Sequence, residues 1–429
     1  MLSYGLSYDE LPESIDADQA LEETLGHGRD WVGRAKLVGE YDDAVERSLI
    51  TLKALTYRHT GGIVGAATTS LPEWLGGERN WGYRFCWLRD ATATLLALMN
   101  AGYFDEACAW RDWLLRAAAG SPDQVQIMYG IRGERQLLEW EIEWLKGYEN
   151  SRPVGIGNAT CSQLQLDIYG EVADALLHGY LGGISVNDTA LGLQQALTDH
   201  LLSIWEQADH GIWEVRGEPK NFTYSKVIAW VAFDRALKTA EKFGLQGDLN
   251  RWREVRDHIH RYVCQKCFDP KLNSFTQSYE SKELDASLLL MPLVGFLPVT
   301  DSRVRGTVAA IERGLMADGL VLRYRTENVD DGLPAGEGVF LACSFWMVSV
   351  LKMMGRDEGA KSLFDRLLSL RNDVGLLSEE YDPRSRRQLG NFPQALSHIA
   401  LINAAFEFTR ARGPGQQRAQ STPSKPNVQ

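Results

Sequence analysis

The feature that most constrains this chain is a long succession of helical patterns. From residue 40 to residue 410, about a dozen segments place apolar residues three or four positions apart, as helices with a buried face do. Several segments begin after Asp, Ser or Asn, or end at Gly, as capped helices do. Convincing strand alternation is scarce. Examples of these helical segments are EACAWRDWLLRAAAG, SKVIAWVAFDRALKTAEKFG, LNRWREVRDHIHRYVCQKC, RVRGTVAAIERGL and CSFWMVSVLKMMGR.

The length of this helical region limits how it can be arranged. The chain has 429 residues, whereas a single hydrophobic core usually stops growing near ~250–300 residues. No low-complexity linker divides the helical region. The chain therefore either splits into domains or forms a toroid of helices that grows around an axis.

The two ends differ from the helical region. Residues 1–30 are polar and loosely patterned, and LSYGLSY within them reads as one strand left from an upstream domain. Residues 412–429, RGPGQQRAQSTPSKPNVQ, are rich in Pro, Gln and Ser, a composition typical of disorder. We therefore expect a linker or remnant strand at 1–30 and a disordered tail at 412–429.

Charge and hydropathy argue against several classes of function. The net charge of -12 and pI of 5.3 are unlike those of nucleic-acid-binding proteins, which carry a basic patch. The longest apolar stretch, ASLLLMPLVGFLPV at 286–299, is too short and too broken by Pro and Gly to cross a membrane. The start of the chain lacks the pattern of a secretion signal, and the cysteines mostly sit in apolar helical contexts typical of buried free thiols. We expect a cytoplasmic protein without nucleic-acid or membrane partners.

A metal site would have to use the segment HIHRYVCQKC (258–267). His260, Cys264 and Cys267 share one helix face, so three zinc ligands are geometrically feasible. No second CxxC pair follows, and His258 points elsewhere on a regular helix. The loops discussed below contain no metal-ligand cluster. We therefore expect no metal and no cofactor.

The helix predicted around DIYGEVADAL (167–176) carries a carboxylate, Glu171, at the edge of its apolar stripe. The neighbouring acid Asp167 lies one turn earlier. A carboxylate against a core is costly unless it is paired, hydrogen-bonded or facing a wet cavity. Glu171 is therefore either a boundary carboxylate with a partner or a catalytic acid whose pKa is raised by its surroundings.

Long loops between the helices are the expected place for a binding site. The loop ERNWGYRFCWLRDA (78–91) ends in Arg89 and Asp90, directly before the helical run ATATLLALM. One interpretation is a helix cap with a neighbouring ion pair. A cap does not require the other aromatic and basic residues of this loop, which are Trp81, Tyr83, Arg84 and Trp87.

The loop DHGIWEVRGEPKNFTYSKVIAW (209–230) also alternates aromatic and charged residues, and includes Trp213, Glu214 and Arg216. Aromatic faces stack on the apolar faces of sugar rings, and charged groups form hydrogen bonds with hydroxyls. The chain contains 13 Trp, 15 Tyr and 14 Phe, which is consistent with such a site, although core packing accounts for most of them. The two loops together are typical of a sugar site.

A second glutamate, Glu337, stands in DDGLPAGEGVFLACSFWMVSVL (330–351). The run after Gly338 is apolar on all sides, which predicts a deeply buried helix. Glu337 at its entrance should stay ionised, because a helix N-terminus stabilises negative charge. An acid at Glu171 and a base at Glu337 would form the carboxyl pair of a glycoside hydrolase, with roughly 5–5.5 Å between them for retention and roughly 6.5–9.5 Å for inversion.

Four motifs in order, NWGYRFCWLRDA, QLQLDIYGEVADAL, GIWEVRG…FTYSKVIAWVAFDRA and GEGVFLACSFW, resemble the bacterial branch of glycoside hydrolase family 15. This resemblance covers about residues 15–410. It implies an all-α (α/α)6 barrel over residues 31–411 that removes glucose with inversion. It also implies that Glu171 is the acid and Glu337 the base. The positions that match sugar-binding residues of the family are Tyr83, Trp87, Arg89, Asp90, Trp213, Glu214 and Arg216.

The sequence departs from the family pattern at Gly82 and Gly155, where relatives carry Asp and often Arg. Loss of these polar side chains is expected to weaken binding or to change linkage preference. The bacterial relatives also carry an N-terminal β-sandwich, and this chain starts near its boundary. LSYGLSY would then be the last strand of that domain. The chain is expected to be either a truncated product, which would be unstable or inactive, or a genuine short form.

From the resemblance we expect an exo-acting hydrolase that releases β-glucose from the non-reducing ends of α-glucans or oligosaccharides, as glucoamylases do. A trehalase is the first alternative. A catalytically weak carbohydrate-binding protein on the same barrel is the second. A lyase or epimerase, which would rely on His or Tyr bases, is the third. The expected partner in each case is a small carbohydrate.

Overall fold

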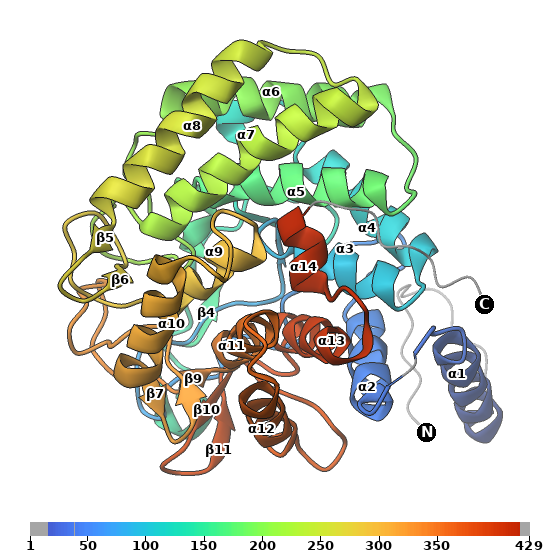
Figure 1. Cartoon of the computed structure of the whole chain (residues 1–429). Helices are drawn as coiled ribbons and strands as arrows, with labels where there is room; N and C mark the ends of the chain where they lie inside the picture. The colour runs from blue at the N-terminus through green and yellow to red at the C-terminus, as the bar shows by residue number, and fades with distance from the viewer. Residues whose placement is uncertain (1–15, 38, 421–429) are drawn as a thin grey trace.

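The computed structural model describes residues 16–37 and 39–420, and within them the helices form two concentric rings (Figure 1). Each helix of the inner ring contacts the next, and the last contacts the first, so the ring closes. The prediction of an (α/α)6 barrel is confirmed. The inner helices are α3 (Ala91–Asn100), α5 (Asp167–Leu181), α7 (Thr223–Phe243), α9 (Leu290–Leu293), α11 (Leu341–Met353) and α13 (Ala395–Thr409).

The outer helices alternate with the inner ones along the chain. They are α2 (Asp42–Ala54), α4 (Phe104–Ala117), α6 (Asp188–Ile204), α8 (Leu249–Lys266), α10 (Ser302–Gly314) and α12 (Asp357–Leu368). Their sequences fit this position, because α8 buries only Trp252, Val255, Ile259 and Val263, at helical spacing. Helix α5, by contrast, is buried on every side from Asp167 to Tyr180. The apolar stripe predicted around Glu171 is therefore part of a fully enclosed helix.

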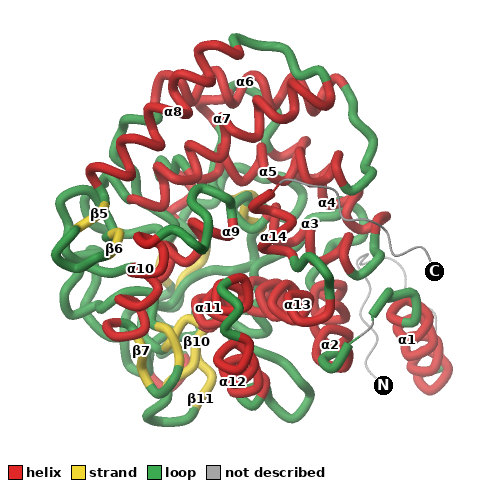
Figure 2. Tube along the Cα trace, in the orientation of Figure 1, coloured by secondary structure: helices red, strands yellow, loops and turns green. Residues whose placement is uncertain are grey.

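Short antiparallel strands and single turns of 3-10 helix lie in the connections (Figure 2). The largest sheet has the order β11-β10-β9, and Glu380 of β10 pairs with Phe340 of β9. The strands are β1 (Cys86–Trp87), β2 (Met128–Tyr129), β3 (Trp140–Glu141), β4 (Gly155–Ile156), β5 (Phe268–Asp269), β6 (Ser274–Phe275), β7 (Met316–Ala317), β8 (Leu320–Val321), β9 (Val339–Phe340), β10 (Glu380–Asp382) and β11 (Arg387–Leu389). The 3-10 turns are η1 (Pro122–Gln124), η2 (Tyr148–Asn150), η3 (Ala159–Ser162) and η4 (Ala286–Leu289).

The two ends of the described chain are more ordered than the sequence predicts. Helix α1 (Ala17–Val32) begins at an Asp16 cap, so the second half of the expected linker at 1–30 is helical. The expected strand in LSYGLSY lies outside the described residues. Helix α14 (Pro414–Gln420) packs on α9, α11 and α13, so the prediction of disorder is wrong for residues 412–420. The polar composition of this segment predicted a solvent-exposed, disordered chain, but contacts with α9, α11 and α13 bury one side of the helix and hold it in place.

The apolar stretch 286–299 belongs to the barrel interior, where η4 and α9 bury most of its side chains. Across the described residues, no helix combines the length and apolar character needed to cross a membrane. The six cysteines are free thiols, three of them buried and three partly exposed. His260 and Cys264 approach to 4.0 Å, whereas the Cys267 thiol lies toward Thr223 and Lys226 on α7.

Candidate active site

A pocket with an enclosed volume of about 50 Å³ opens among the loops at one end of the barrel. Its wall combines charged and aromatic groups, as expected for a site that binds a hydroxylated ring. The arginines are Arg79, Arg89, Arg216 and Arg323, the carboxylates are Glu73, Glu214 and Asp331, and the aromatic residues are Trp81, Tyr83, Trp213, Tyr324 and Phe340.

Glu214 is a carboxylate of this pocket that accepts hydrogen bonds from three side chains. Its Oε1 accepts hydrogen bonds from Trp87 Nε1 at 2.7 Å and from Arg89 Nη1 at 3.0 Å. Its Oε2 accepts a hydrogen bond from Thr160 Oγ1 at 2.9 Å. The backbone of Glu214 has φ of 58°, which is uncommon for a residue with a side chain and marks functional sites more often than others. The loop thus holds this carboxylate in one fixed direction.

Arg89 and Asp90 join this pocket to a second, deeper cavity. Arg89 Nη1 donates to the Ile212 carbonyl at 2.7 Å, and Arg89 Nε lies 3.3 Å from Asp90 Oδ1. Asp90 precedes α3, yet its side chain makes no capping hydrogen bond. Burial raises the pKa of Asp90, and the adjacent Arg89 opposes this rise. Asp90 faces the cavity instead of capping the helix, so the simple cap interpretation fails here.

Aromatic and cationic side chains stack along the pocket wall. The Arg323 guanidinium lies 5.5 Å from the Trp213 ring centroid and 5.4 Å from that of Phe340. The Trp213 Nε1 donates to Asp285 at 3.0 Å, which fixes the ring. At the rim, Arg216 lies 4.8 Å from the Trp81 ring and forms an ion pair with a carboxylate on the surface. These contacts make the wall rigid before a ligand binds.

A group of buried carboxyls lies behind Tyr83. Burial raises the pKa of the Tyr83 hydroxyl well above its usual value, and the charges of Glu379, Glu73 and Glu214 raise it further. Tyr83 therefore lies near three carboxylates, which come from different loops. Burial also raises the pKa of Glu73 to about 7 and holds the pKa of Glu379 well above its usual range.

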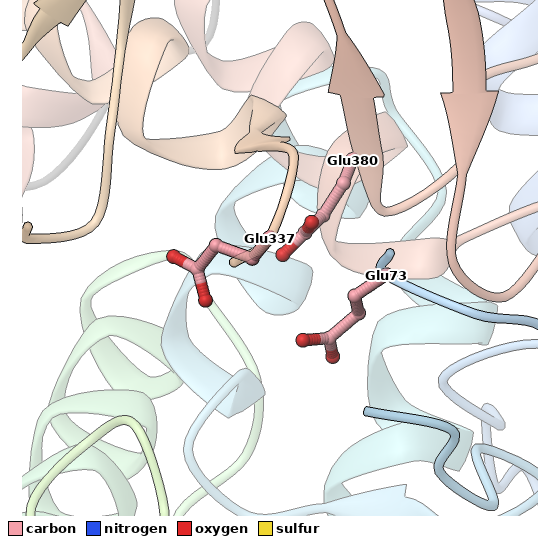
Figure 3. Close-up of side chains that lie close together, drawn as sticks. All are labelled: Glu73, Glu337 and Glu380. Atoms are coloured by element: carbon pink, nitrogen blue, oxygen red, sulfur yellow. The ribbon is translucent and has the colours of Figure 1, made fainter. Parts of the chain in front are cut away.

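A second group of carboxyls consists of Glu73, Glu337 and Glu380. Each has an oxygen within 4.8 Å of the others (Figure 3). Such an arrangement could hold a cation. Arg323 already supplies positive charge there, since it bonds to Glu337, lies 3.3 Å from Glu73 and lies 3.8 Å from Glu380. Among the described residues, a guanidinium of the chain itself thus faces these carboxyls, while Glu73 Oε1 and Glu380 Oε1 make no hydrogen bond.

Glu171 and Glu337, the predicted acid and base, do not share a cavity. Glu171 lines the deeper cavity, and Arg418 Nη2 lies 2.6 Å from both of its oxygens. Burial raises the pKa of Glu171, as predicted, and Arg418 opposes the rise.

Glu337 lies behind the main pocket, where it forms ion pairs with Arg323 and Arg79. Its predicted place at a helix start is wrong, because Val339 and Phe340 pair with β10 and α11 begins only at Leu341. The positive group that faces the Glu337 carboxylate is the Arg323 guanidinium and not the start of a helix. Glu171 and Glu337 thus line no common cavity among the described residues, and their roles as acid and base stay predictions.

The predicted sugar-binding residues, in contrast, come together. Tyr83, Arg89, Trp213, Glu214 and Arg216 line the main pocket. Trp87 supports Glu214 from behind, and Asp90 lines the deeper cavity. The residues that sequence reasoning missed are Glu73, Arg79, Arg323, Asp331, Glu379, Glu380 and Arg418. The sequence signal available for two of them, Glu379 and Glu380, was the pair of adjacent acids in SEEYD (378–382).

The two glycines that depart from the family pattern differ in their surroundings. A Cβ at Gly82 would lie 2.6 Å from the carbonyl oxygen of Gly157, so no side chain fits without backbone movement. A Cβ at Gly155 would meet nothing closer than 3.9 Å. The backbone around Gly82 therefore favours glycine, and the expected effect of the two glycines on binding or linkage preference stays a prediction.

Comparison with known proteins places the chain among glycosidases. The trehalases of Mycobacterium tuberculosis and Mycolicibacterium smegmatis are 42% and 44% identical to it over 418 residues, which is 95% of this chain and 61% and 62% of those proteins. The chain thus spans about three fifths of the length of these relatives. The trehalase of Thermoplasma acidophilum is 39% identical over 408 residues, covering 95% of this chain and 70% of the relative.

Solved structures share the fold at low sequence identity. A structure titled as a wild-type glycosidase matches with a TM-score of 0.68 at 16% identity, over 92% of this chain and 99% of the other. A bacterial glucoamylase complexed with acarbose matches with a TM-score of 0.67 at 12% identity, over 95% of this chain and 60% of the other. The model of glycosyl hydrolases family 15 matches residues 39–406. This chain therefore belongs to glycosyl hydrolases family 15.

Proposed function

We propose that this chain hydrolyses the glycosidic bond of α,α-trehalose with inversion at one anomeric carbon. The observation that carries the proposal is a pocket wall of charged and aromatic groups that contains Tyr83 and Glu214, with the buried Glu379 near Tyr83. The trehalase names of relatives 39–44% identical to the chain support the substrate. These relatives favour trehalose over the α-glucans that the sequence motifs first suggested.

Glu214 and Glu379 are the proposed catalytic carboxyls. Glu214 stands nearer the mouth, since its side chain is 15% exposed and Arg216 at the rim follows two residues later. It would donate a proton to the glycosidic oxygen. Glu379 is buried near Tyr83, and burial raises its pKa. In its ionised form it would take a proton from the water that attacks C1 from the opposite face. The bond to the leaving glucose breaks as the bond to water forms.

The remaining polar groups are proposed to bind the glucose that is released. Arg89 and Asp90 at the inner end would form hydrogen bonds with its hydroxyls, as charged groups do strongly in a water-poor site. Trp213 and Trp87 would supply the aromatic wall. Arg323 would bind hydroxyls from the opposite side, while Glu337 and Glu73 hold its guanidinium in place. Arg216 would contact the second sugar at the rim.

An α-glucan hydrolase of the glucoamylase type is the second candidate. The hairpin of β3 and β4 leaves Trp140 62% and Trp144 81% exposed. Its neighbour Glu139 pairs with Arg216 at the pocket rim, at 2.8 Å. Exposed indoles at this place could stack successive sugar units of a longer chain. Trehalose, with two units only, would not need them.

Glucose release from equal concentrations of trehalose, maltose, isomaltose and soluble starch tests the proposal. Trehalose should give the highest kcat/KM. Faster release from starch or maltose would instead support the glucoamylase-type activity. A folded protein that releases no glucose from any of the four would refute hydrolysis and support a carbohydrate-binding role. Trp140→Ala is a useful companion, because it should slow starch turnover only.

A further inference from the structure

The last described helix, α14, closes one end of the barrel. It packs on α9, α11 and α13, and Figure 1 shows it in front of the middle of the inner ring. Contacts that do not involve Arg418 hold it there. Gly415 N donates to Glu407 Oε1 at 2.6 Å, and Asn100 Nδ2 donates to Gln417 Oε1 at 3.2 Å. The helix is thus anchored independently of its arginine.

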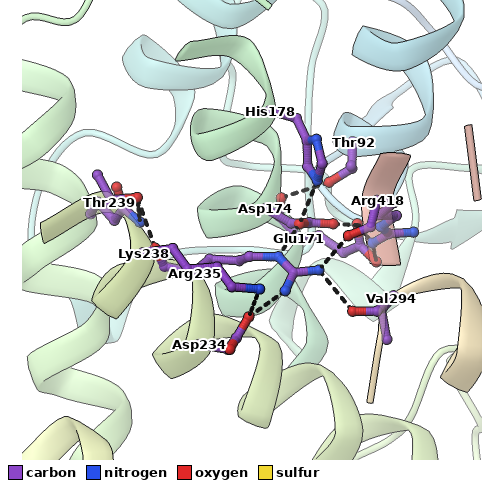
Figure 4. A network of polar contacts seen from close by, with 11 residues as sticks. Thr92, Glu171, Asp174, His178, Asp234, Arg235, Lys238, Thr239, Val294 and Arg418 are labelled. Carbon is purple, nitrogen blue, oxygen red and sulfur yellow. Dashed lines mark hydrogen bonds and ion pairs between the residues drawn. The ribbon is translucent and has the colours of Figure 1, made fainter. Parts of the chain in front are cut away.

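Arg418 points from α14 into the barrel and bridges two carboxylates of α5. Its Nη2 lies 2.6 Å from both oxygens of Glu171, and its Nε bonds to Asp174 (Figure 4). Asp174 also bonds to Arg235, which in turn donates to the backbone carbonyl of Arg418 at 3.0 Å. The side chains of Arg418 and Glu171 are only 10% and 3% exposed. A buried charge pair of this kind costs much when one partner is lost.

The bridge forms one wall of the deeper cavity, which has an enclosed volume of about 50 Å³. Arg418 and Glu171 line it together with Arg89 and Asp90. Arg89 also lines the main pocket, so the two cavities adjoin. The end of the sugar pocket therefore consists of polar groups from α5, from the start of α3 and from the C-terminal helix.

A mere anchor for α14 would not require this arrangement. Gln417 and Gly415 already fix the helix, and a buried guanidinium on a cavity wall is costly compared with an apolar side chain. The position of Arg418 is explained if the cavity needs Glu171 in its ionised form, directed at the same space as Asp90. Resting on the proposed function, we propose that Arg418 is a positioning residue of the sugar pocket, which holds Glu171 at its closed end for binding of the glucose hydroxyls.

The charged groups around Glu171 fix the direction of the expected pH effect. Burial raises the pKa of Glu171, Arg418 lowers it, and Asp174 raises it. Without Arg418, Glu171 would keep its proton to higher pH. The acidic limb of the activity profile should therefore move to higher pH. The titratable and charged groups that face Glu171 or share its cavity are Asp167 and Asp174 on α5, Tyr224 on α7, Arg89 and Asp90 before α3, and Arg418 on α14.

Arg418→Ala in the full chain tests the proposal, with Gln417→Ala as the matched control on the same helix. Arg418→Ala should raise KM for trehalose at least thirtyfold, because small misplacement of binding groups costs roughly 100-fold in rate. It should move the acidic limb upward by about one pH unit, and added guanidinium ions should restore part of the affinity. Gln417→Ala should lower the melting temperature and leave KM and the pH profile unchanged.

Arg418→Lys keeps the test decisive if the alanine variant fails to fold. Lysine retains the charge but is expected to reach only one carboxylate at a time, so KM should rise about tenfold. The proposal would be overturned if folded Arg418→Ala or Arg418→Lys kept the KM and the pH profile of the wild type. It would also be overturned if Gln417→Ala changed KM and the pH profile as much as the Arg418 variants do. These outcomes presuppose that the wild type turns over trehalose. Absence of turnover in the wild type would refute the proposed function itself, which separates the two failures.

Discussion

Replacement of Glu214 by Gln is the sharpest perturbation of the proposed chemistry. The substitution keeps the shape of the side chain and, at the position of Oε1, an oxygen that can accept from Trp87 and Arg89. The amide NH2 replaces Oε2 and faces the Thr160 hydroxyl, which can accept a hydrogen bond from it. The amide has no acidic proton to give to the leaving group. Arg89 retains Asp90 at 3.3 Å and the Ile212 carbonyl at 2.7 Å, so the fold should be affected little.

The expected loss depends on the leaving group. A general acid contributes roughly 10²–10⁴ in rate, or about 3–5 kcal/mol of transition-state stabilisation. Glu214→Gln should therefore lower kcat/KM for trehalose by about 10³-fold. The loss on α-glucosyl fluoride should be less than about tenfold, because fluoride leaves without a proton. Initial rates of glucose release from both substrates measure the two numbers.

Two further variants complete this experiment. Glu379→Gln should lose activity on both substrates, since both need an activated water. Glu139→Gln, at a rim carboxylate that is 32% exposed and pairs with Arg216, serves as the control and should change kcat/KM by less than about threefold. Equal losses on the two substrates in Glu214→Gln, or activity near that of the wild type, would refute its role as the acid.

Three other predictions follow from the packing and charges around the pocket. Glu337→Gln should raise KM at least tenfold and retain measurable kcat, because Glu337 holds an arginine of the wall; complete loss of turnover in a folded variant would return the base role to it. Gly82→Ala should lower the free energy of unfolding by roughly 1–3 kcal/mol, because its Cβ would meet the backbone, and Gly155→Ala should lower it by less than about 0.5 kcal/mol. Thermal unfolding measures both values, and equal effects would contradict this reasoning. Burial raises the pKa of Glu407 to about 7, so its stabilising contribution is complete below pH 4.5 and is lost as pH rises through 7. Glu407→Gln should remove roughly 3 kcal/mol of this pH dependence between pH 5 and 8, measured by denaturant unfolding, and an unchanged slope would count against it.

The ring of helices was predictable because it depends on local patterns. Inner helices such as Leu341–Met353 are apolar on all sides, and outer ones such as Leu249–Lys266 on one side. Loops that mix Trp, Arg and Glu between such helices also indicated the pocket. Trp213, Glu214 and Arg216 could be found because all three belong to one loop.

The partners of the carboxylates were not predictable, because they come from distant parts of the chain. Arg418 lies 247 residues from Glu171 in a segment whose composition is typical of disorder. The start of α11 was also predicted too early, because the pairing of Val339 with Tyr381 of β10 is a long-range contact. Which carboxylate is paired and which faces the pocket depends on such contacts and not on helical periodicity.

Proton NMR of the first products formed from α,α-trehalose tests the central claim most directly. Inversion at one anomeric carbon yields one β-glucose from the glycone and one α-glucose from the leaving group, so the two anomeric signals should grow at the same initial rate before mutarotation. Initial formation of α-glucose alone would indicate retention and contradict the assignment of an acid and a water-activating base to this pocket.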